Sequence, residues 1–300
     1  MDYSTRPWPC AEIFSSSRFF HGHCFPHCDI RYNKAMTDLK LICVDMDGTF
    51  LNHDMTYNRE RFERLRAIMK QRGIQFAVAS GNQYEQLKSF FANPDELIYI
   101  AENGTLIIDR TETIFVAELD PKTIQTIYDT VMPITSSFCV STPHMAYAFE
   151  NDPNLDSIAP YYHRLTLVND LSSIHGPVNK LSVILDEHLA PDLIHTLNQR
   201  MNGKALAVYS GFKCIDIMTT GNHKGHGVEL ICRRYGIRPD QVMAFGDNDN
   251  DAEMLAYAGY SYAMATASPK AKAVAKYLAP ANVEDGVNTI LEQHLLALTD

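Results

Sequence analysis

The sequence predicts an α/β fold, in which a doubly wound parallel sheet carries a second, smaller α+β unit inserted into it. Apolar strand-like runs alternate with amphipathic helix-like stretches from residue 41 to 116 and again after residue 221. That alternation is typical of βαβ units, whose helices cover both faces of a parallel sheet. Between these two parts, residues 120–220 contain mostly short strands. A segment of this length is too long for a loop, so we expect an inserted domain.

The first part of the chain begins with the apolar run Leu41–Val44, which predicts a buried strand. The next stretch has Phe62, Leu65 and Met69 at helical spacing, and Gly73 ends it. In order, we predict a strand at 41–44, a helix at 58–72, a strand at 74–79, a helix at 83–91, a strand at 97–101, and a hairpin that pairs 106–108 with 114–116.

The remaining elements follow from the same rules of spacing. In the inserted unit we predict helices at 121–131 and 190–201 and short strands at 137–140, 145–149, 180–185, 205–209 and 213–218. After it we predict a helix at 225–235, a strand at 241–245, a helix around Met254, a strand at 260–265, and helical segments at 268–276 and 285–298. The predicted domains are therefore a core made of residues 37–119 and 221–300, and an inserted domain at 120–220.

The composition is that of a globular protein with a full hydrophobic core. Of 300 residues, 46% are hydrophobic and 21% charged, and no apolar run approaches the ~20 residues of a membrane span. The formal net charge of −10 disfavours a nucleic acid or an anionic membrane as partner. A small anionic substrate is compatible with it, because local charge governs a pocket. Seven cysteines without a regular spacing predict free thiols and a reducing cytoplasm.

The first 36 residues differ from the rest of the chain. They are rich in proline and serine and show no hydrophobic periodicity, so we expect residues 1–36 to be a disordered or non-native leader. Met36 stands just before the folded pattern and is a candidate start of the native chain. The histidines and cysteines between His21 and Cys28 are zinc-ligand types, but no second ligand cluster accompanies them.

Two aspartates at the end of the first predicted strand form the most informative feature of the sequence. Asp45 and Asp47 stand at positions i and i+2 and precede a Gly-Thr turn. In an extended chain such residues project to the same side, at the strand end where α/β proteins bind ligands. Two ionised carboxylates this close repel each other unless a cation such as Mg²⁺ lies between them or one keeps a proton. One of them could then attack phosphorus while the other transfers protons.

Three further strand or helix ends carry polar residues. Ser80 follows the second strand, Lys224 opens a helix, and the run Gly246–Asp251 follows a later strand. Taken singly, Ser80 fits an N-cap turn, Lys224 a solvated lysine, and the acidic run a helix N-terminus. Three aspartates within five positions nevertheless repel each other unless a cation or a lysine lies nearby. We therefore expect these ends to gather around one site.

In order and spacing, these residues resemble the four motifs of the haloacid dehalogenase-like (HAD) hydrolase superfamily: DxDGT at Asp45–Thr49, then Ser80, Lys224, and GDxxND at Gly246–Asp251. The resemblance implies a HAD-like core. The insertion falls between the second and third motifs, where Cof-type phosphatases of subclass IIB carry an inserted cap of C2B type. The strings ASGNQYEQL, AENG, PYYHRL and GDNDNDAEML are similar to those of the bacterial SupH-like sugar phosphatases. Two departures from the family pattern are Asn248, in place of Ser or Thr, and Thr266, where Asn is frequent.

The resemblance implies a Mg²⁺-dependent phosphomonoester hydrolase, with a small phosphorylated metabolite such as a sugar phosphate as partner. Asp45 would attack phosphorus and form an aspartyl-phosphate, and Asp47 would protonate the leaving oxygen and later deprotonate water. Asp45, the backbone carbonyl of Asp47, and Asp247 would hold Mg²⁺. Lys224 would balance charge, oriented by Asp251. The phosphate would be bound by Lys224 and by groups of Met46, Ser80, Gly81, Asn82 and Asn250.

The inserted cap is expected to close over the site and recognise the sugar, with Tyr147, His163 and Arg164 as candidate contacts. Three alternatives stay open: a phosphatase of pyridoxal phosphate or flavin mononucleotide, transfer of the phosphoryl group to a second sugar, and a sensor that only binds a phosphometabolite. The presence of both Asp45 and Asp47 disfavours the sensor. The sequence indicates neither the preferred sugar nor the oligomeric state.

Overall fold

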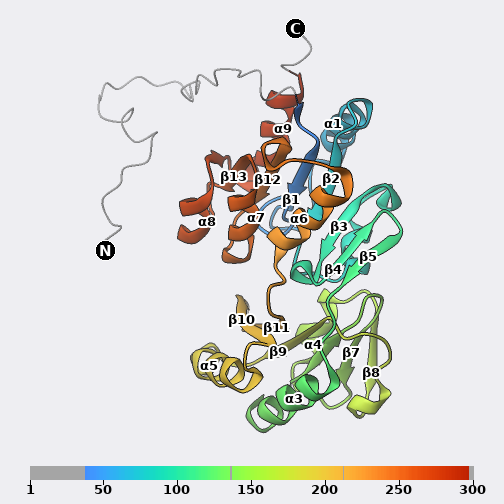
Figure 1. Ribbon diagram of the computed structural model, residues 1–300, viewed down its shortest axis with the longest axis vertical. Coiled ribbons are helices and arrows are strands. Elements are labelled where there is room, and N and C mark those ends of the chain that lie inside the picture. Colours follow the sequence, from blue (N-terminus) through green and yellow to red (C-terminus); the bar gives the residue numbers. More distant parts are fainter. Residues whose placement is uncertain (1–37, 136, 212, 297–300) are drawn as a thin grey trace, which may run out of the picture. The chain divides into compact units, whose positions relative to one another are not determined.

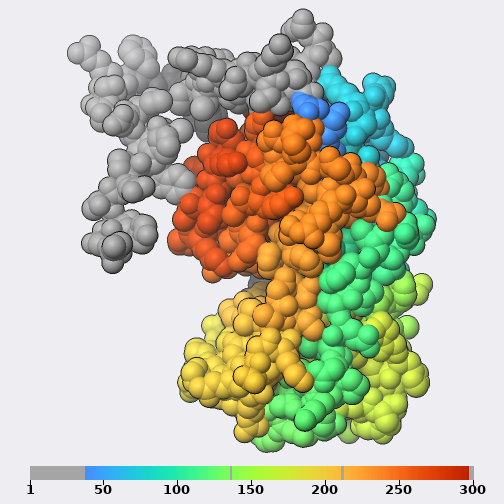
Figure 2. All heavy atoms as spheres, in the orientation of Figure 1, coloured from blue at the N-terminus to red at the C-terminus, as the bar shows by residue number. Residues whose placement is uncertain are grey.

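The computed structural model describes residues 38–296, apart from residues 136 and 212, and its strands form two separate sheets (Figure 1). Early segments of the chain, coloured blue to cyan, lie beside late segments, coloured orange to red, whereas the green to yellow middle segments lie together (Figure 2). The chain leaves the first sheet after residue 116 and returns to that part of the molecule after residue 219. The predicted leader at residues 1–36 lies outside the described residues.

The larger sheet is built from both ends of the described chain. Its strands are β1 Leu41–Val44, β2 Gln75–Ala79, β3 Ile98–Ala101, β4 Leu106–Asp109, β5 Glu112–Val116, β12 Val242–Gly246, β13 Tyr260–Met264 and β14 Tyr277–Ala279. Their order is β14-β13-β12-β1-β2-β3-β4-β5, with parallel neighbours from β14 to β3 and an antiparallel hairpin at the β5 edge. All residues of the central strand β1 are buried. The carboxyl ends of β1, β2 and β12 therefore meet at one edge, where α/β sheets bind ligands.

Helices cover both faces of this sheet. They are α1 Arg59–Gln71, α2 Tyr84–Ser89, α6 Lys224–Tyr235, α7 Ala252–Tyr257, α8 Pro269–Val274 and α9 Gly286–Leu296. The chain moves outward from β1 to β2 but in the opposite direction from β12 to β13, so right-handed crossovers place α1 and α7 on opposite faces. α1 packs against α9, and α6 packs against α7. Among the described helices, none is long and apolar enough to cross a membrane.

The smaller sheet is mixed, and two helices cover one of its faces. Its strands are β6 Cys139–Ser141, β7 Ala146–Phe149, β8 Leu165–Val168, β9 Lys180–Ile184, β10 Ala205–Gly211 and β11 Cys214–Thr219; its helices are α3 Pro121–Thr135, the short α4 Leu155–Ile158, and α5 Ala190–Met201. The strand order is β10-β11-β9-β6-β7-β8, in which β7 and β8 are parallel and the other neighbours antiparallel. α3 and α5 pack in one hydrophobic cluster with Leu181, Val183 and Ile217. We call this unit the cap.

The other face of the cap sheet is polar at its centre. Side chains alternate along a strand, so Lys180 and Ser182 of β9 project away from the helices that cover Leu181 and Val183. Asp216 of β11 lies opposite Ser182 and shares its side. Lys180 and Asp216 both contact loops of the larger sheet. The polar face of the cap is therefore the one that meets the core.

The structure confirms the predicted fold class, and most predicted elements lie within a few residues of their observed positions. Three short elements were not predicted: α4, β8 and β14. β8 buries Val168 alone of its four residues, and β14 has three residues at a sheet edge, so neither carries a clear apolar pattern. α3 continues through Pro133 to Thr135, beyond its predicted end. The domain boundaries at 119/120 and 220/221 stay predictions.

Candidate active site

A buried lysine joins the ends of two neighbouring strands. Lys224 is the first residue of α6, and it is 1% exposed. Its Nζ lies 2.6 Å from Asp45 Oδ1, just after β1, and 2.6 Å from Asp251 Oδ1, after β12. Burial by itself would lower the pKa of Lys224, but Asp251 and Asp45 raise it above its usual value. The Lys224 ammonium therefore stays charged and neutralises part of the negative charge of the two carboxylates.

Asp251 is fixed by the turn that carries it. Its Oδ2 accepts hydrogen bonds from the backbone N–H groups of Asp247 and Asn248, each at 3.0 Å. Its Oδ1 accepts from Lys224, so both carboxylate oxygens are engaged. Asn248, the departure from the family pattern, accepts a hydrogen bond from the Asp249 backbone in the same turn. The geometry suits Asp251 for holding Lys224 in place.

Asp247 lies against the turn that follows β1. Thr49 Oγ1 donates a hydrogen bond of 2.9 Å to Asp247 Oδ1. Gly48 has a φ of +78°, and a Cβ at this position would collide with the Asp247 carboxylate. A glycine is therefore required at position 48 both by the backbone conformation and by the approach of Asp247.

Three carboxylates around Lys224 offer oxygen atoms to a metal ion. Asp45, Asp247 and Asp251 each provide one carboxylate oxygen, and these atoms lie within 4.8 Å of one another. Burial, followed by the charge of Asp251, raises the pKa of both Asp45 and Asp247, because one lysine does not balance three carboxylates. Oxygen ligands with surplus negative charge fit a hard divalent cation. The predicted ligands were Asp45, Asp247 and the backbone carbonyl of Asp47; the side-chain cluster has Asp251 as its third member.

Asp47 lies at the exposed side of the cluster. Its Oδ2 accepts a hydrogen bond of 2.7 Å from Asn82 Nδ2, which brings the turn after β2 next to the turn after β1. Although the side chain reaches solvent, desolvation by the surrounding protein raises the pKa of Asp47, and the Asn82 hydrogen bond opposes this shift. This carboxyl group is suited to exchange protons with a bound molecule.

The turn after β2 brings Ser80, Gly81 and Asn82 together. Ser80 is buried, and its Oγ accepts a hydrogen bond of 3.1 Å from the Asn82 N–H. The Ser80 N–H donates to Ile100 of the neighbouring strand, which fixes the start of the turn. We call residues 80–82 the phosphate turn, after their predicted role.

The structure adds contacts that the motif search missed. Asn250 Nδ2 donates a hydrogen bond of 3.0 Å to Asn103 Oδ1, and Asn103 Nδ2 donates one of 2.9 Å to Asp216 of the cap. Lys180 of the cap reaches the carbonyl of Gly81 at 2.8 Å. Of the residues that were not predicted, Asn103 gave a sequence signal as part of the string AENG, whereas Lys180 and Asp216 of the cap lie far away along the chain.

One predicted cap contact is wrong. Tyr147 lies opposite Val140 in the sheet and packs into the hydrophobic cluster under α3 and α5. It therefore points away from the polar face that meets the core. The physical reason is strand parity: adjacent residues project to opposite faces, and the sequence did not show which face of β7 would be covered by helices.

Arg164 and His163 lie on an exposed segment before β8. A residue of the core, Gln83, binds this segment. The side chain of Gln83 accepts a hydrogen bond of 3.1 Å from the Arg164 N–H and donates one of 3.0 Å to the Arg164 carbonyl. Arg164 Nη1 also lies 3.8 Å from Glu85 Oε1. Gln83 directly follows the phosphate turn, so this segment is anchored beside it. The two residues stay predicted substrate contacts.

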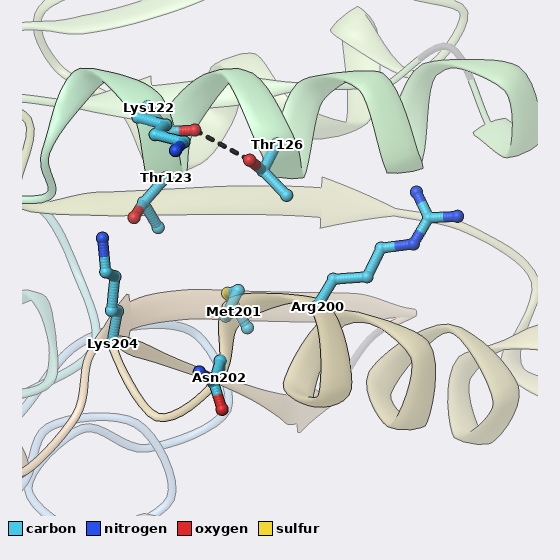
Figure 3. A pocket seen from close by; sticks show the side chains of 7 residues that line it. All are labelled: Lys122, Thr123, Thr126, Arg200, Met201, Asn202 and Lys204. Atoms are coloured by element: carbon cyan, nitrogen blue, oxygen red, sulfur yellow. Dashed lines mark hydrogen bonds between the residues drawn. The ribbon is translucent and has the colours of Figure 1, made fainter.

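A hollow on the helix-covered side of the cap lies between α3 and α5, and none of the predicted site residues lines it (Figure 3). Figure 3 shows its lining side chains, which are Lys122, Thr123, Thr126, Arg200, Met201, Asn202 and Lys204.

Comparisons with known proteins identify the family. Residues 42–291 match the model of the haloacid dehalogenase-like hydrolases. YbjI of Escherichia coli K12, a 5-amino-6-(5-phospho-D-ribitylamino)uracil phosphatase, is 36% identical over 261 residues, 86% of this chain and 96% of that protein. The crystal structure of a Streptococcus mutans protein is similar with a TM-score of 0.81 and 32% identity, over 86% of this chain and 99% of that one. The subclass IIB sugar phosphatase BT4131 shares the fold, with a TM-score of 0.71 and 19% identity over 85% of this chain and 98% of that one.

The chain therefore belongs to the haloacid dehalogenase-like hydrolases. Its parallel core sheet with a separate mixed cap sheet is the fold that it shares with the subclass IIB phosphatase BT4131. The narrower resemblance to SupH-like sugar phosphatases stays a prediction, because the relative with 36% identity is named for a different substrate.

Proposed function

We propose that this protein is a Mg²⁺-dependent phosphatase of sugar phosphates and similar small phosphorylated metabolites, and that it acts through an aspartyl-phosphate. The observation that carries the proposal is the buried cluster in which Lys224 bridges Asp45 and Asp251, with the Asp247 carboxylate beside them. Burying charged groups is unfavourable, so such a cluster is typical of a functional site.

Asp45 is the proposed nucleophile. Lys224 binds its Oδ1, which leaves Oδ2 to form the bond to phosphorus while the bond from phosphorus to the leaving oxygen breaks. Lys224, held in place by Asp251, neutralises the negative charge that the attacking carboxylate and the phosphoryl oxygens bring together. Mg²⁺, held by Asp45, Asp247 and the carbonyl of Asp47, would supply further positive charge to the phosphoryl oxygens.

Asp47 is the proposed general acid and base. Its raised pKa increases the fraction of molecules that carry the proton needed by the leaving oxygen, and Asn82 orients the carboxyl group. After the alcohol has left, the same carboxylate accepts a proton from the water that attacks the aspartyl-phosphate. That second step releases inorganic phosphate and restores Asp45.

The phosphate is proposed to lie between the turn after β1, the phosphate turn and Asn250. Both the phosphate turn and Asn250 contact Asn103, which supports their convergence on one molecule. In this arrangement the backbone N–H of Met46, the Ser80 hydroxyl and the Asn250 amide would donate hydrogen bonds to the phosphoryl oxygens.

A second substrate class follows from the relative with 36% identity. That relative is named for a phosphate carried on a ribityl chain attached to a pyrimidine. Such a compound is a sugar-alcohol phosphate with a heterocycle, and it lies between the sugar phosphates and the cofactor-type phosphates considered above. The cap would have to accept the heterocycle beside Arg164.

A phosphate-release screen tests the proposed function. Purified full-length protein would be assayed against hexose and pentose phosphates, the ribitylaminouracil phosphate, pyridoxal phosphate, flavin mononucleotide and a small aryl phosphate, each with Mg²⁺ or with a chelator. We expect Mg²⁺-dependent release from at least one sugar or sugar-alcohol phosphate. Product analysis with a second sugar present would reveal transfer instead of hydrolysis. No release from any member of the panel with Mg²⁺ would contradict the proposal.

A further inference from the structure

The turn after β3 has an unusual backbone. Glu102, Asn103 and Gly104 have φ values of +51°, +57° and +88°, so three successive residues adopt the left-handed region. For residues other than glycine this conformation costs about 1 kcal/mol each, although asparagine tolerates it better than most. A turn of this kind persists only where its surroundings fix it, and such turns cluster at functional sites.

Contacts with the core fix one side of this turn. The Asn103 N–H donates a hydrogen bond of 2.9 Å to the Ser80 carbonyl, and the Glu102 N–H donates one of 3.2 Å to the Asn82 carbonyl. Gly104 packs so closely on the carbonyl of His223, the residue before Lys224, that a Cβ would collide with it. The turn therefore supports the phosphate turn and adjoins the start of α6.

Contacts with the cap fix the other side. Lys180 Nζ lies 2.6 Å from Glu102 Oε2 and 2.8 Å from the Gly81 carbonyl. Asp216 Oδ2 accepts a hydrogen bond of 2.9 Å from Asn103 Nδ2. Lys180, Glu102, Asn103 and Asp216 are each at most 5% exposed. These contacts of the cap with the two turns are therefore made by buried side chains.

The contacts from Asp216 through Asn103 to Asn250 fix the orientation of each side-chain amide, because donors and acceptors must alternate along them. The Asp216 carboxylate accepts and cannot donate, so it selects the NH₂ group of Asn103. Asn103 Oδ1 must then face away from the cap, where it accepts from Asn250 Nδ2. The orientation of the Asn250 amide is set in turn, and its second N–H stays available to a ligand. A Cβ at Gly81 would lie 3.1 Å from Asn103 Oδ1, so the glycine leaves room for this contact.

We propose that Asn103 is a positioning residue that couples the seating of the cap, through Asp216, to the orientation of Asn250 and the phosphate turn. The inference rests on the proposed function, because it takes Asn250 and that turn as phosphate ligands. The cap then does more than contact the remote part of the substrate. It also determines whether the phosphate site is correctly formed.

Two variants interrupt the chain of contacts in different ways. Asn103→Gly removes the side chain but keeps a residue that adopts positive φ freely. Asp216→Asn keeps the shape. Because Ser182 Oγ donates to Asp216 Oδ1 at 2.7 Å and Lys180 Nζ lies 3.6 Å from the same atom, the new amide oxygen is favoured there. Its NH₂ group then faces the NH₂ of Asn103, which favours the reversed orientation of the Asn103 amide. Asn103→Gly leaves the ion pairs of Lys180 unchanged, whereas Asp216→Asn removes its more distant carboxylate partner and keeps the closer one, Glu102. Asn202→Gly is the matched control, because Asn202 has a φ of +48° and caps α5 on the cap surface.

The readouts are orthophosphate binding by calorimetry with Mg²⁺ present, and kcat for a sugar phosphate and an aryl phosphate. We expect Asn103→Gly and Asp216→Asn each to weaken orthophosphate binding and lower kcat for both substrates by about tenfold, the effect of one misplaced charge-assisted hydrogen bond. The double variant should be no worse than the more severely impaired single variant, because both substitutions interrupt the same chain of contacts. Asn202→Gly should leave both quantities unchanged.

The two proposals fail in different ways. If wild-type protein releases phosphate but both variants bind orthophosphate within twofold of it, the role of Asn103 is overturned and the proposed function stands. Strictly additive effects in the double variant would equally overturn the coupling to the cap. If wild-type protein releases no phosphate from any substrate, the proposed function fails, and with it the positioning role.

Discussion

Lys224 is surrounded by carboxylates that would repel one another without it. Asp45 and Asp251 bind it directly at 2.6 Å, and Asp247 offers an oxygen within 4.8 Å of theirs. At the scale of single residues the site is therefore a balance of charge, in which one lysine and, as proposed, one divalent cation offset three aspartates. Replacing any one of these charged residues by a neutral one changes that balance by a whole charge.

Asp45→Asn is expected to abolish turnover while the fold stays intact. The change removes the proposed nucleophile and one negative charge with almost no change in volume, and Lys224 keeps Asp251 as a partner. We expect kcat for an aryl phosphate to fall by more than about a thousandfold, a loss of over ~4 kcal/mol in transition-state stabilisation. Thermal unfolding and circular dichroism would check the fold. Asp240→Asn, at an exposed surface position, is the control, and a smaller loss at Asp45 would exclude it as the nucleophile.

Gly48→Ala is expected to weaken Mg²⁺ binding. The added Cβ would collide with the Asp247 carboxylate and displace a proposed metal ligand. Gly203→Ala is the matched control, because Gly203 has a φ of +77° and nothing within 4 Å of the added Cβ. We expect both variants to lose about 1 kcal/mol of stability from backbone strain. Only Gly48→Ala should raise the Mg²⁺ concentration for half-maximal activity, by about tenfold; equal Mg²⁺ requirements would contradict this role of Gly48.

The sequence predicted the charged residues of the site because their chemistry is local. Asp45 and Asp47 share a strand end, and the aspartates after β12 share a turn. The Asn103 contacts could not be predicted in this way, because Asp216 and Asn250 are 113 and 147 residues away along the chain. A neutral amide also leaves no unbalanced charge in the sequence that would require a partner.

At the scale of elements, parallel strands place the site, and helix α9 packs against α1 and β14. The apolar strands β1, β2 and β12 were predicted because their residues are nearly all buried. The edge strands β8 and β14 were missed, since an exposed edge needs no apolar pattern. α9 packs its buried His294 on β13, where His294 Nε2 lies 2.6 Å from the Tyr262 hydroxyl.

His294 is expected to make the protein sensitive to mild acid. Burial lowers the pKa of His294 from 6.5 to about 4, so below pH 6.5 the unfolded chain binds a proton that the folded protein does not. Stability is therefore lost as pH falls from about 6.5 to about 4, by ~2 kcal/mol between pH 7 and pH 5. His294→Gln should flatten the pH dependence of the free energy of unfolding by that amount. Urea titrations at both pH values would measure it, and an unchanged slope would contradict the assignment.

At the scale of the whole molecule, the two faces of the cap sheet have different tasks. One face packs under α3 and α5, and the other carries Lys180 and Asp216 to the core loops. The sequence predicted an inserted α+β unit from its length and its strand spacing, but it did not show which face of each strand would be covered. For that reason Tyr147 was predicted as a substrate contact although it belongs to the covered face.

Arg164→Ala is expected to change selectivity without changing the chemistry. Its guanidinium belongs to the cap and lies 3.8 Å from Glu85 Oε1, so as a predicted cap contact it would meet the remote part of a substrate. We expect relative kcat/KM among sugar phosphates to change by about tenfold, or ~1.4 kcal/mol. Hydrolysis of a small aryl phosphate should stay within about threefold, since that substrate hardly reaches the cap. Tyr147→Ala is the control, expected to lower stability but to leave the ranking of substrates unchanged.

A uniform fall across every substrate in Arg164→Ala, aryl phosphate included, would contradict a selectivity role. It would mean that the residue serves the attachment of the cap. A change in substrate ranking in Tyr147→Ala would contradict its placement on the covered face.

The hydrogen bonds of Gln83 bear on how such an enzyme could acquire a new substrate. Gln83 binds the backbone N–H and the backbone carbonyl of Arg164 and not its side chain, so the attachment excludes only proline, which lacks the N–H, at position 164. Mutations at positions 163 and 164 can therefore sample new side chains beside the phosphate turn while the segment stays attached. Position 83 has no such freedom, because its side chain must both donate and accept. When the substrate range of such enzymes diverges, we therefore expect positions 163 and 164 to change first and position 83 to change last.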